Sequence, residues 1–422
     1  MLSAIRQSED EICQAIYQDL GKSNAETYMA EIGMVYAEIK EALRKLDRWS
    51  RPKRVAGTMA TFPAKNYLYS EPYGVVLILA PWNYPFNLSM APLVGAIAAG
   101  NCAVLKCSKS SIHTANVIRS IINNTFPAKY ICCVDAEAAY DEVLEQNYDY
   151  IFFTGSPGVG KIIMKAASEH LTPVSLELGG KSPCIVTESA DLRMAAKRIV
   201  WGKFLNAGQT CISIDYVIVK ESVKQRFVQY LQEEIEKRYA DAQERDDYPN
   251  IISVHHYDRL CGLIDREKTV LGGKRNPQKR KIAPTILPEA EFDHEIMEEE
   301  IFGPILPVIS YRSLEEMIRL IKDRPKPLAC YIFTGEKKTA DRLISEISYG
   351  GGCVNDVFLH IANHHLPFGG VGYSGMGGYH GKYSFDTFSH KKGVVKNLTC
   401  VDIPLRYAPY DEKKRKLLKH FL

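Results

Sequence analysis

The sequence lacks long apolar runs, an excess of charge of one sign and any CxxC pair of cysteines. Its longest apolar stretch, Val75 to Pro81, has the length of a strand, so no transmembrane helix is predicted. The first residues contain no apolar signal core, and a secretory leader is therefore not expected. With a net charge of +3 over 422 residues, the chain has no basic excess that would indicate nucleic acid as a partner.

The eleven cysteines are odd in number and scattered along the chain. This arrangement argues against a disulfide framework and a zinc ribbon, and it predicts a reducing cytoplasm. His360, His364 and His365 lie close in sequence, but they are interpreted as loop residues, and no metal site is expected. The length of the chain predicts two or three domains, because a single core does not grow to this size.

The first 72 residues show two different patterns. Residues 4–50 carry apolar side chains at helical spacing, which predicts two packing helices that say little about function. Residues 51–72 break into turn residues and short alternating runs, which predicts a β-hairpin. A hairpin that stands off the core needs another surface to bury it, so a role in oligomerisation is expected.

From residue 74 onward, strands and helices alternate. Strands are predicted at 74–80, 102–106, 130–134, 150–153, 184–186, 216–219, 305–309 and 329–333, with helices between most of them and a loop-rich region at 241–285. Such alternation indicates parallel, doubly wound sheets, whose ligands bind beyond the carboxyl ends of the strands. Unusual residues follow three of these ends, at 81–85, 106–109 and 154–161.

The glycine loop, residues 155–162, follows a strand and opens a helix. It comes close to a Walker A loop, but Ile162 has no hydroxyl to hold Mg²⁺, and the GxGxxG spacing also fails. A helix start after a glycine turn offers free N–H groups to a phosphate. A plain strand-to-helix turn is an equally open interpretation, and Lys106 alone would be a surface lysine.

Cys211 follows a small turn that contains Gly208 and the amide side chain of Gln209. Glycine lets the backbone take conformations closed to other residues, so the turn can present a thiol sharply. A thiolate there would be a strong nucleophile if its pKa were lowered. Free cysteine is more often a small buried apolar residue, and the residues alone leave this alternative open.

Six motifs occur in an order that resembles the NAD(P)-dependent aldehyde dehydrogenase superfamily, and they span nearly the whole chain. They are Asn83 within residues 81–85, the glycine loop, Glu177-Leu178-Gly179-Gly180-Lys181, Gly208-Gln209-Thr210-Cys211, Glu300-Ile301-Phe302-Gly303-Pro304 and Pro367-Phe368-Gly369-Gly370. Residues 350–356 and 379–385 resemble the class 3 branch, which oxidises medium- and long-chain aliphatic and aromatic aldehydes.

The resemblance implies an α/β fold with two doubly wound parallel-sheet domains and a small β oligomerisation arm. The implied division is a cofactor-binding domain at 1–50 and 73–180, a catalytic domain at 181–385, an arm at 51–72 and 386–402, and a tail at 403–422. A homodimer is implied as well. The basic tail is interpreted as a solvated helix, with weak binding to an anionic membrane surface as the alternative.

The resemblance also implies a role for each residue of the site. Cys211 would attack the aldehyde carbon to give a thiohemiacetal, and hydride transfer to NAD or NADP would leave a thioester. Asn83 and the N–H of Cys211 would hold the oxyanion, and Glu177 would act as general base for hydrolysis. Glu300 and Phe302 would position the nicotinamide ribose and ring, with Lys106 at the adenosine ribose and Ser156 at the pyrophosphate. The other implied cofactor-binding residues are Trp82, Lys109, Gly155, Gly160, Leu178 and Gly179.

Two positions depart from the family pattern. Lys109 stands where the family commonly has a glutamate that binds ribose hydroxyls, and a lysine would attract a 2′-phosphate. We therefore hypothesise that NADP is accepted, perhaps in preference to NAD. Ile214 stands where class 3 sequences usually have proline, and we expect it to alter loop stiffness only.

The sequence disfavours three rival interpretations. A relative that passes the acyl group to coenzyme A is disfavoured by Glu177, which such members usually lack. A non-catalytic protein that retains the fold is disfavoured by the presence of Asn83, Glu177 and Cys211 together. A P-loop nucleotidase is disfavoured by Ile162. Several of the implied site residues also have a purely structural interpretation. Asn83 could form a turn, Glu177 could be a salt-bridge partner, and Glu300 could belong to a solvated acidic run.

Overall fold

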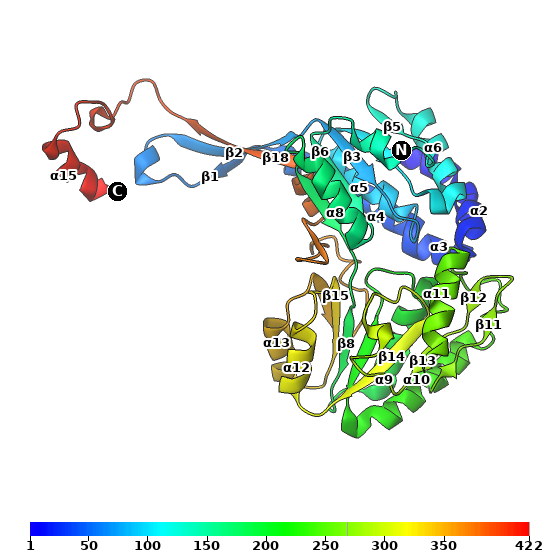
Figure 1. Cartoon of the computed structure of the whole chain (residues 1–422). Coiled ribbons are helices and arrows are strands. Elements are labelled where there is room, and N and C mark those ends of the chain that lie inside the picture. Colours follow the sequence, from blue (N-terminus) through cyan, green and yellow to red (C-terminus); the bar gives the residue numbers. More distant parts are fainter. Residues whose placement is uncertain (268, 422) are drawn as a thin grey trace.

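The structure, a computed structural model, describes residues 1–267 and 269–421. Two α/β bodies lie one above the other in Figure 1, and a narrow β arm projects from the upper one. The upper body contains a six-stranded sheet of order β17-β7-β6-β3-β4-β5, and the lower body a seven-stranded sheet of order β10-β13-β14-β9-β8-β15-β16. Every pair in these sheets is parallel except β17–β7 and β10–β13 at the edges. The predicted α/β class with two parallel sheets is confirmed.

The upper body begins with helices and continues as a strand–helix alternation. Its elements are α1 (Leu2–Gln7), α2 (Glu9–Leu20), α3 (Asn24–Thr27), the π-helical turn η1 (Tyr28–Ile32), α4 (Gly33–Ser50), β3 (Val75–Leu79), α5 (Asn87–Ala98), β4 (Cys102–Lys106), η3 (Lys109–Ser111), α6 (Ile112–Thr125), β5 (Ile131–Cys133), α7 (Tyr140–Leu144), β6 (Tyr150–Thr154), α8 (Pro157–Ser168), β7 (Val174–Glu177) and the late strand β17 (Gly375–Met376). Apolar residues fill β3 and β6, as expected for parallel strands covered on both faces.

The lower body repeats the alternation. Its elements are β8 (Pro183–Val186), α9 (Leu192–Phe204), η4 (Leu205–Gly208), β9 (Tyr216–Lys220), η5 (Glu221–Val223), α10 (Lys224–Tyr239), α11 (Val254–Asp265), β10 (Leu271–Gly272), β11 (Arg275–Asn276), β12 (Lys281–Ile282), β13 (Thr285–Leu287), η6 (Glu295–Met297), β14 (Ile305–Tyr311), α12 (Leu314–Lys322), β15 (Ala329–Phe333), α13 (Lys337–Glu346) and β16 (Gly351–Val354). Helix α14 (Lys382–Thr387) then returns to the upper body, where it packs on α5.

The arm is a three-stranded antiparallel sheet of order β1-β2-β18, formed by β1 (Lys53–Val55), β2 (Lys65–Pro72) and β18 (Ser389–Lys396), with η2 (Met59–Thr61) at its turn. The predicted hairpin is β1–β2, which pair antiparallel. Beyond β18 the chain forms η7 (Pro404–Arg406) and helix α15 (Glu412–Phe421) at the tip of the arm. Leu422, part of the proposed tail, lies outside the described residues, and the tail's membrane contact stays a prediction. No described helix is long and apolar enough to cross a membrane.

Two local predictions were wrong, and one strand of the upper sheet was not predicted. Residues 4–50 form more than two helices, because α3 and η1 fill the stretch before α4. The predicted loop region 241–285 contains helix α11, which Ser253 caps by accepting a hydrogen bond from the N–H of His256. Strand β7 was missed because four residues give too short a pattern, although its pairing with β6 carries Glu177 to the sheet edge.

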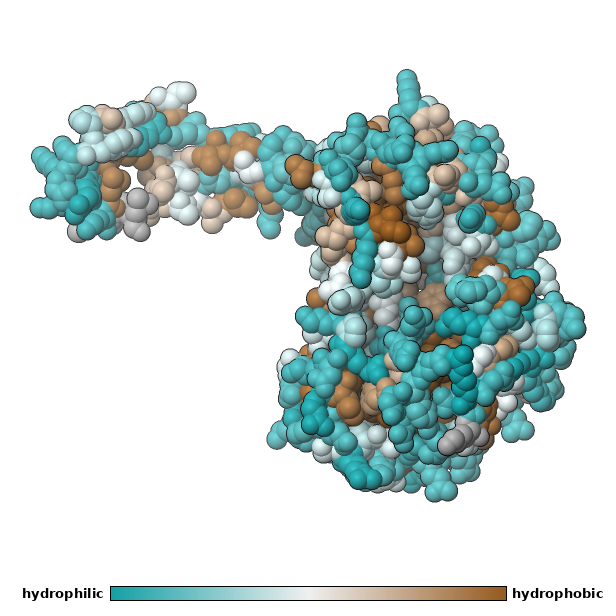
Figure 2. Space-filling model, viewed as in Figure 1, coloured by the Kyte–Doolittle hydropathy of each residue, from teal (hydrophilic) through white to brown (hydrophobic). Residues whose placement is uncertain are grey.

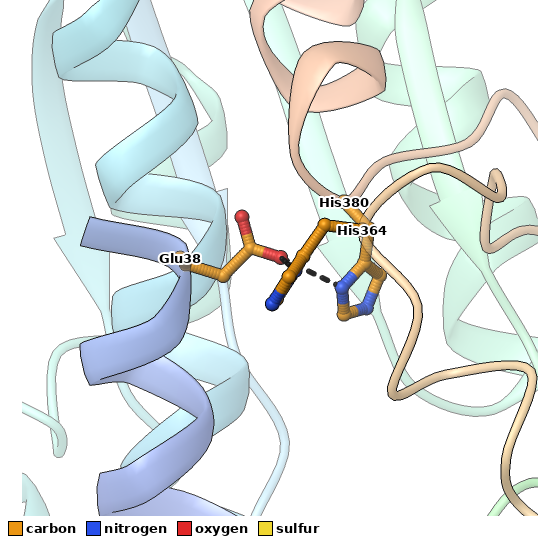
Figure 3. A group of neighbouring side chains, drawn as sticks. All are labelled: Glu38, His364 and His380. Carbon is orange, nitrogen blue, oxygen red and sulfur yellow. Dashed lines mark hydrogen bonds and ion pairs between the residues drawn. The ribbon is translucent and has the colours of Figure 1, made fainter. Parts of the chain in front are cut away.

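A buried carboxylate fixes helix α4 to the segment between β16 and α14 (Figure 3). Glu38 Oε1 accepts hydrogen bonds from Nδ1 of His364 (3.1 Å) and of His380 (2.8 Å), and Oε2 accepts one from the N–H of Gly381 (3.0 Å). Burial raises the pKa of Glu38, but the hydrogen bonds from the histidines and Gly381 outweigh it and lower the pKa to about 2. The pKa of His364 is raised by its hydrogen bond to Glu38.

This carboxylate makes the stability of the protein depend on pH. The folded pKa of Glu38 lies below the unfolded value of about 4.3, so its ionised form contributes roughly 3 kcal/mol above that pH and loses about half of it by pH 3. The His364 contribution has the opposite sign: it is complete below pH ~6.5 and is lost as pH rises through the folded pKa. We expect Glu38→Gln to reduce the free energy of unfolding in urea more at pH 6 than at pH 3. The exposed control Glu236→Gln should show no such trend, and an equal loss at both pH values for Glu38→Gln would contradict the assignment.

Candidate active site

A cleft of about 800 Å³ opens beyond the carboxyl ends of the strands of the upper sheet. It brings together ten of the residues singled out in the sequence: Trp82, Asn83, Gly155, Ser156, Glu177, Leu178, Gly179, Cys211, Glu300 and Phe302. These residues come from the loops after β3, β6 and β7, from the turn after α9 and from the segment before β14. The position of the cleft agrees with the general rule for ligands of open α/β sheets.

Three consecutive residues in left-handed conformations shape the turn before Cys211. Asn206, Ala207 and Gly208 have φ values of 51°, 50° and 75°. A Cβ on Gly208 would lie 2.3 Å from the carbonyl oxygen of Gly303, so only glycine fits there. Such conformations are costly for residues with a Cβ and persist only where surrounding contacts enforce them.

Hydrogen bonds from neighbouring segments hold this turn. The N–H of Asn206 donates to Glu26 Oε1 (2.8 Å), and the side chain of Gln209 donates to the carbonyl of Asn250 (3.0 Å) and accepts from the N–H of Ile252 (3.0 Å). The amides of Asn206 and Gln209 are completely buried. The turn is therefore fixed from both bodies of the molecule, and Cys211 has a defined position at its end.

Asn83 lies directly against the Cys211 turn. Its Nδ2 donates to the carbonyl of Gln209 (3.1 Å), and its own carbonyl accepts from Nδ2 of Asn206 (2.8 Å). The hydroxyl of Tyr84 is 2.7 Å from Oγ1 of Thr210, the residue before the cysteine. Two segments that are far apart in sequence thus place an amide side chain against the turn that carries the thiol.

The thiol of Cys211 is not activated by its surroundings alone. Burial raises its pKa to about 12, and the charges of Glu300 and Glu177 act in the same direction. The N–H groups of Cys211 and Ile212 oppose this shift without reversing it. The thiol is therefore protonated at neutral pH in this arrangement. The positive charge of a nicotinamide ring would favour the thiolate.

Glu177 is a buried carboxyl group at the end of β7, with 2% of its surface exposed. Neither carboxyl oxygen has a hydrogen-bond partner within residues 1–267 and 269–421. Burial raises its pKa well above the usual value. A buried carboxyl that lines the cleft without a partner is suited to exchange a proton with a bound water or substrate.

Glu300 lies against the backbone of the Glu177 loop. A Cβ on Gly179 would lie 2.2 Å from Glu300 Oε2, which explains why a glycine occupies that position. Burial raises the pKa of Glu300 to about 8, the charge of Asp215 acts in the same direction, and a hydrogen bond with the N–H of Gly180 opposes it. The next cleft residue, Phe302, has a φ of 53°, and its ring meets that of Trp82 edge-on with centroids 5.4 Å apart.

The far part of the cleft suits a dinucleotide. Ser156 caps helix α8, where its side chain accepts from the N–H of Val159 (3.4 Å). Pro157 has no N–H and Gly160 donates to the Ser156 carbonyl, so Gly158 is the first-turn residue whose N–H is left for a phosphate. Lys106 does not line the cleft: it is buried, and its Nζ donates to the carbonyl of Ala136 (2.9 Å). Lys109 is exposed on η3 beside Ser108, which does line the cleft. Gly160 packs against Leu178, where a Cβ would lie 2.9 Å from its side chain.

No role was assigned from the sequence to several residues of this site. Lys181 donates to Asp215 (2.5 Å) and to the carbonyls of Ile296 and Glu299, while Asp215 Oδ1 accepts from the N–H of Ile301. This network holds the segment that carries Glu300. Helix α11 and neighbouring loops add polar groups to the cleft: His255, His256, Arg259, Arg324, Lys326 and Tyr373. The apolar spacing of Tyr257, Leu260 and Ile264 behind Ser253 was the signal that would have revealed α11.

Comparisons with known proteins agree with this geometry. The chain matches the aldehyde dehydrogenase family over residues 1–394. It is 47% identical to the 4,4′-diaponeurosporen-aldehyde dehydrogenase of Staphylococcus aureus over 99% of this chain and 92% of that one, and 44% identical to the dimeric NADP-preferring aldehyde dehydrogenase of Rattus norvegicus over 97% and 91%. The solved substrate-bound structure of the Staphylococcus aureus AldH superposes with a TM-score of 0.96 at 46% identity, covering 99% of this chain and 92% of that one.

The relatives also include members of aldehyde dehydrogenase family 3, such as member A2 of Mus musculus at 43% identity. An NAD⁺ complex of an aldehyde dehydrogenase from Bacillus cereus has the same fold, with a TM-score of 0.80 at 28% identity, covering 94% of this chain and 82% of that one. The resemblance to the class 3 branch is thereby confirmed, and NAD or NADP is the cofactor. The chain belongs to the aldehyde dehydrogenase family and is an enzyme that acts on aldehydes.

Proposed function

We propose that this enzyme oxidises medium- and long-chain aliphatic or aromatic aldehydes to carboxylic acids by covalent catalysis at Cys211. The observation that carries the proposal is the convergence of Cys211, Asn83 and Glu177 at one cleft, with a helix start suited to a dinucleotide in the same cleft. The relative named for a 4,4′-diaponeurosporen aldehyde supports a long apolar substrate.

Each group has a distinct step in this proposal. The Cys211 thiolate adds to the aldehyde carbon, and the carbonyl oxygen becomes an oxyanion that the Asn83 amide and the Cys211 N–H stabilise. Bound NAD or NADP supplies the hydride acceptor that leaves a thioester on the sulfur. Glu177 takes a proton from water, the resulting hydroxide adds to the thioester carbon, and the carboxylic acid leaves as the thiol is restored. Trp82, Glu300, Phe302, Leu178 and Gly179 would position the nicotinamide end, and Gly155, Ser156, Gly160 and Lys109 the other end. Lys106 would reach the adenosine ribose only after its Nζ leaves the carbonyl of Ala136.

The exposed side chain of Lys109 carries the cofactor hypothesis. Reversing its charge with Lys109→Glu should lower kcat/KM with NADP roughly tenfold, since a 2′-phosphate would lose an attraction and meet a repulsion, and should change the value with NAD much less. A steady-state screen of aldehyde chain length against both cofactors measures this and tests the proposed substrate class, with Cys211→Ala as the blank and Lys129→Glu as the surface control. The NADP preference would be contradicted if kcat/KM with NAD equalled or exceeded that with NADP and if Lys109→Glu left this ratio unchanged. Formation of acyl-CoA in place of free acid when coenzyme A is added would favour the CoA-acylating alternative.

The arm supports the proposed homodimer. It exposes large apolar side chains, among them Met59 (69%), Phe62 (71%) and Val395 (57%), and Figure 2 shows hydrophobic residues along its length. A thin arm with such a surface needs a partner surface to bury it. A relative named as dimeric is 44% identical to this chain over 97% of the chain's length. Sedimentation that gives only the monomer mass at assay concentration would contradict a dimer.

A further inference from the structure

A buried ion pair from the N-terminal helices reaches the loop that carries Asn83. Lys22 and Glu31 are both completely buried, and Lys22 Nζ lies 2.6 Å from Glu31 Oε1. Lys22 Nζ also donates to the backbone carbonyl of Asn83 (3.3 Å) and lies 4.2 Å from the centre of the Tyr84 ring. These helices were expected to serve packing alone, yet Lys22, which follows α2, contacts the loop that carries Asn83 directly.

Glu31 holds the other end of the same loop. Its Oε2 accepts hydrogen bonds from the N–H groups of Phe86 (2.9 Å) and Asn87 (3.4 Å), where α5 begins. A carboxylate at this position satisfies N–H groups that have no partner within the helix and matches the positive end of its dipole. Lys22 thus binds the loop between β3 and α5 at the Asn83 carbonyl, and Glu31 binds it at the N–H groups where α5 begins.

The backbone conformation around Glu31 positions its side chain toward the loop between β3 and α5. Residues Tyr28 to Ile32 form a π-helical turn in which the N–H of Gly33 donates to the carbonyl of Tyr28. A Cβ on Gly33 would lie only 2.8 Å from that carbonyl oxygen, so the absence of a side chain permits the widened turn. Before it, Gly21 ends α2 in a left-handed conformation (φ 61°), and Lys22 follows directly. Widened turns of this kind are frequent at functional sites.

Stability alone is a poor reason for such a pair. The cost of removing two charges from water commonly matches or exceeds their attraction, so well-packed neutral residues often do as well. We infer that Lys22 and Glu31 are positioning residues for aldehyde oxidation, which hold the Asn83 amide at the oxyanion by fixing the backbone on both sides of it. The inference rests on the proposed oxyanion role of Asn83. A misplacement of about 1 Å at a catalytic group can cost roughly a hundredfold in rate.

The test is a double-mutant cycle that compares wild type, Lys22→Met/Glu31→Gln, Asn83→Ala and the triple variant. Replacing both charged residues together leaves neither member of the pair buried without the other, and Lys22→Gln/Glu31→Gln is the second choice if the first pair does not fold. We expect the paired replacement to lower kcat about 10- to 100-fold, with aldehyde KM and cofactor Kd changed less than about threefold. In the Asn83→Ala background, the same replacement should cost less than about threefold, because the group it positions is absent.

Two controls separate the possible results. The exposed pair variant Lys337→Met/Asp341→Asn on α13 should retain full activity, and urea midpoints should show that all variants are folded. An equal fold-loss of kcat in both backgrounds would show a general structural effect and overturn the inference, as would no loss at all in the presence of Asn83. An Asn83→Ala enzyme with wild-type kcat would overturn the proposed oxyanion role itself, which the cycle reports separately.

Discussion

Cys211→Ser is expected to lower kcat for aldehyde oxidation by about 10⁴-fold or more, because a serine hydroxyl is a much weaker acid than a thiol and forms the nucleophilic anion far less readily. The buried surroundings that raise the thiol pKa to about 12 would disfavour an alkoxide still more. NAD(P)H absorbance measures the rate, and binding of the dinucleotide, followed by its fluorescence, should be unchanged.

A second cysteine provides the matched control for this substitution. Cys102 at the start of β4 is half-buried like Cys211 but lies outside the cleft, and Cys102→Ser should keep the wild-type rate. Retention of more than about a hundredth of the activity in Cys211→Ser would exclude Cys211 as the nucleophile.

Glu177→Gln should separate the two halves of the reaction. The substitution preserves the size of the side chain and removes the proton acceptor, so the first turnover should form NAD(P)H at a rate within about tenfold of wild type, while steady-state kcat falls about 10²- to 10⁴-fold. Stopped-flow measurement should therefore show a burst, and intact-mass analysis should show an acyl group on the protein. Glu169→Gln, an exposed change just after the end of α8, should behave as wild type.

The pH dependence of the second half gives an independent test. Burial raises the pKa of Glu177, so its basic form gains population only as pH rises, and the hydrolysis rate should rise with it. That alkaline increase should disappear in Glu177→Gln. A variant without a burst, in which the first turnover is slowed as much as the steady state, would assign Glu177 to an earlier step.

The residues of the site could be predicted from the sequence, whereas most of the contacts that hold them in place could not. Asn83, Glu177 and Cys211 stand in local motifs with glycine and amide neighbours, and the residues that flank them line one cleft. The groups that hold these three residues in place do not belong to such local motifs. Lys22 meets Asn83 across 61 residues, and Glu38 meets His380 across 342, so no local spacing signals either contact. The left-handed backbone at Asn206 and Ala207 was equally hidden, since neither residue type demands it and tertiary contacts impose it.

The arm has a consequence for the order of folding during synthesis. Its central strand β2 pairs with β18, and the side chains of Lys391 and Ser70 in these strands meet across 321 residues. Until β18 leaves the ribosome, β2 has only the short strand β1 as a partner, and an isolated two-stranded hairpin is marginally stable in water. Strand β17, at the edge of the upper sheet, is also made late. Both the upper body and the arm therefore wait for the part of the chain from residue 375 onward. Until then, they carry open strand edges through most of translation.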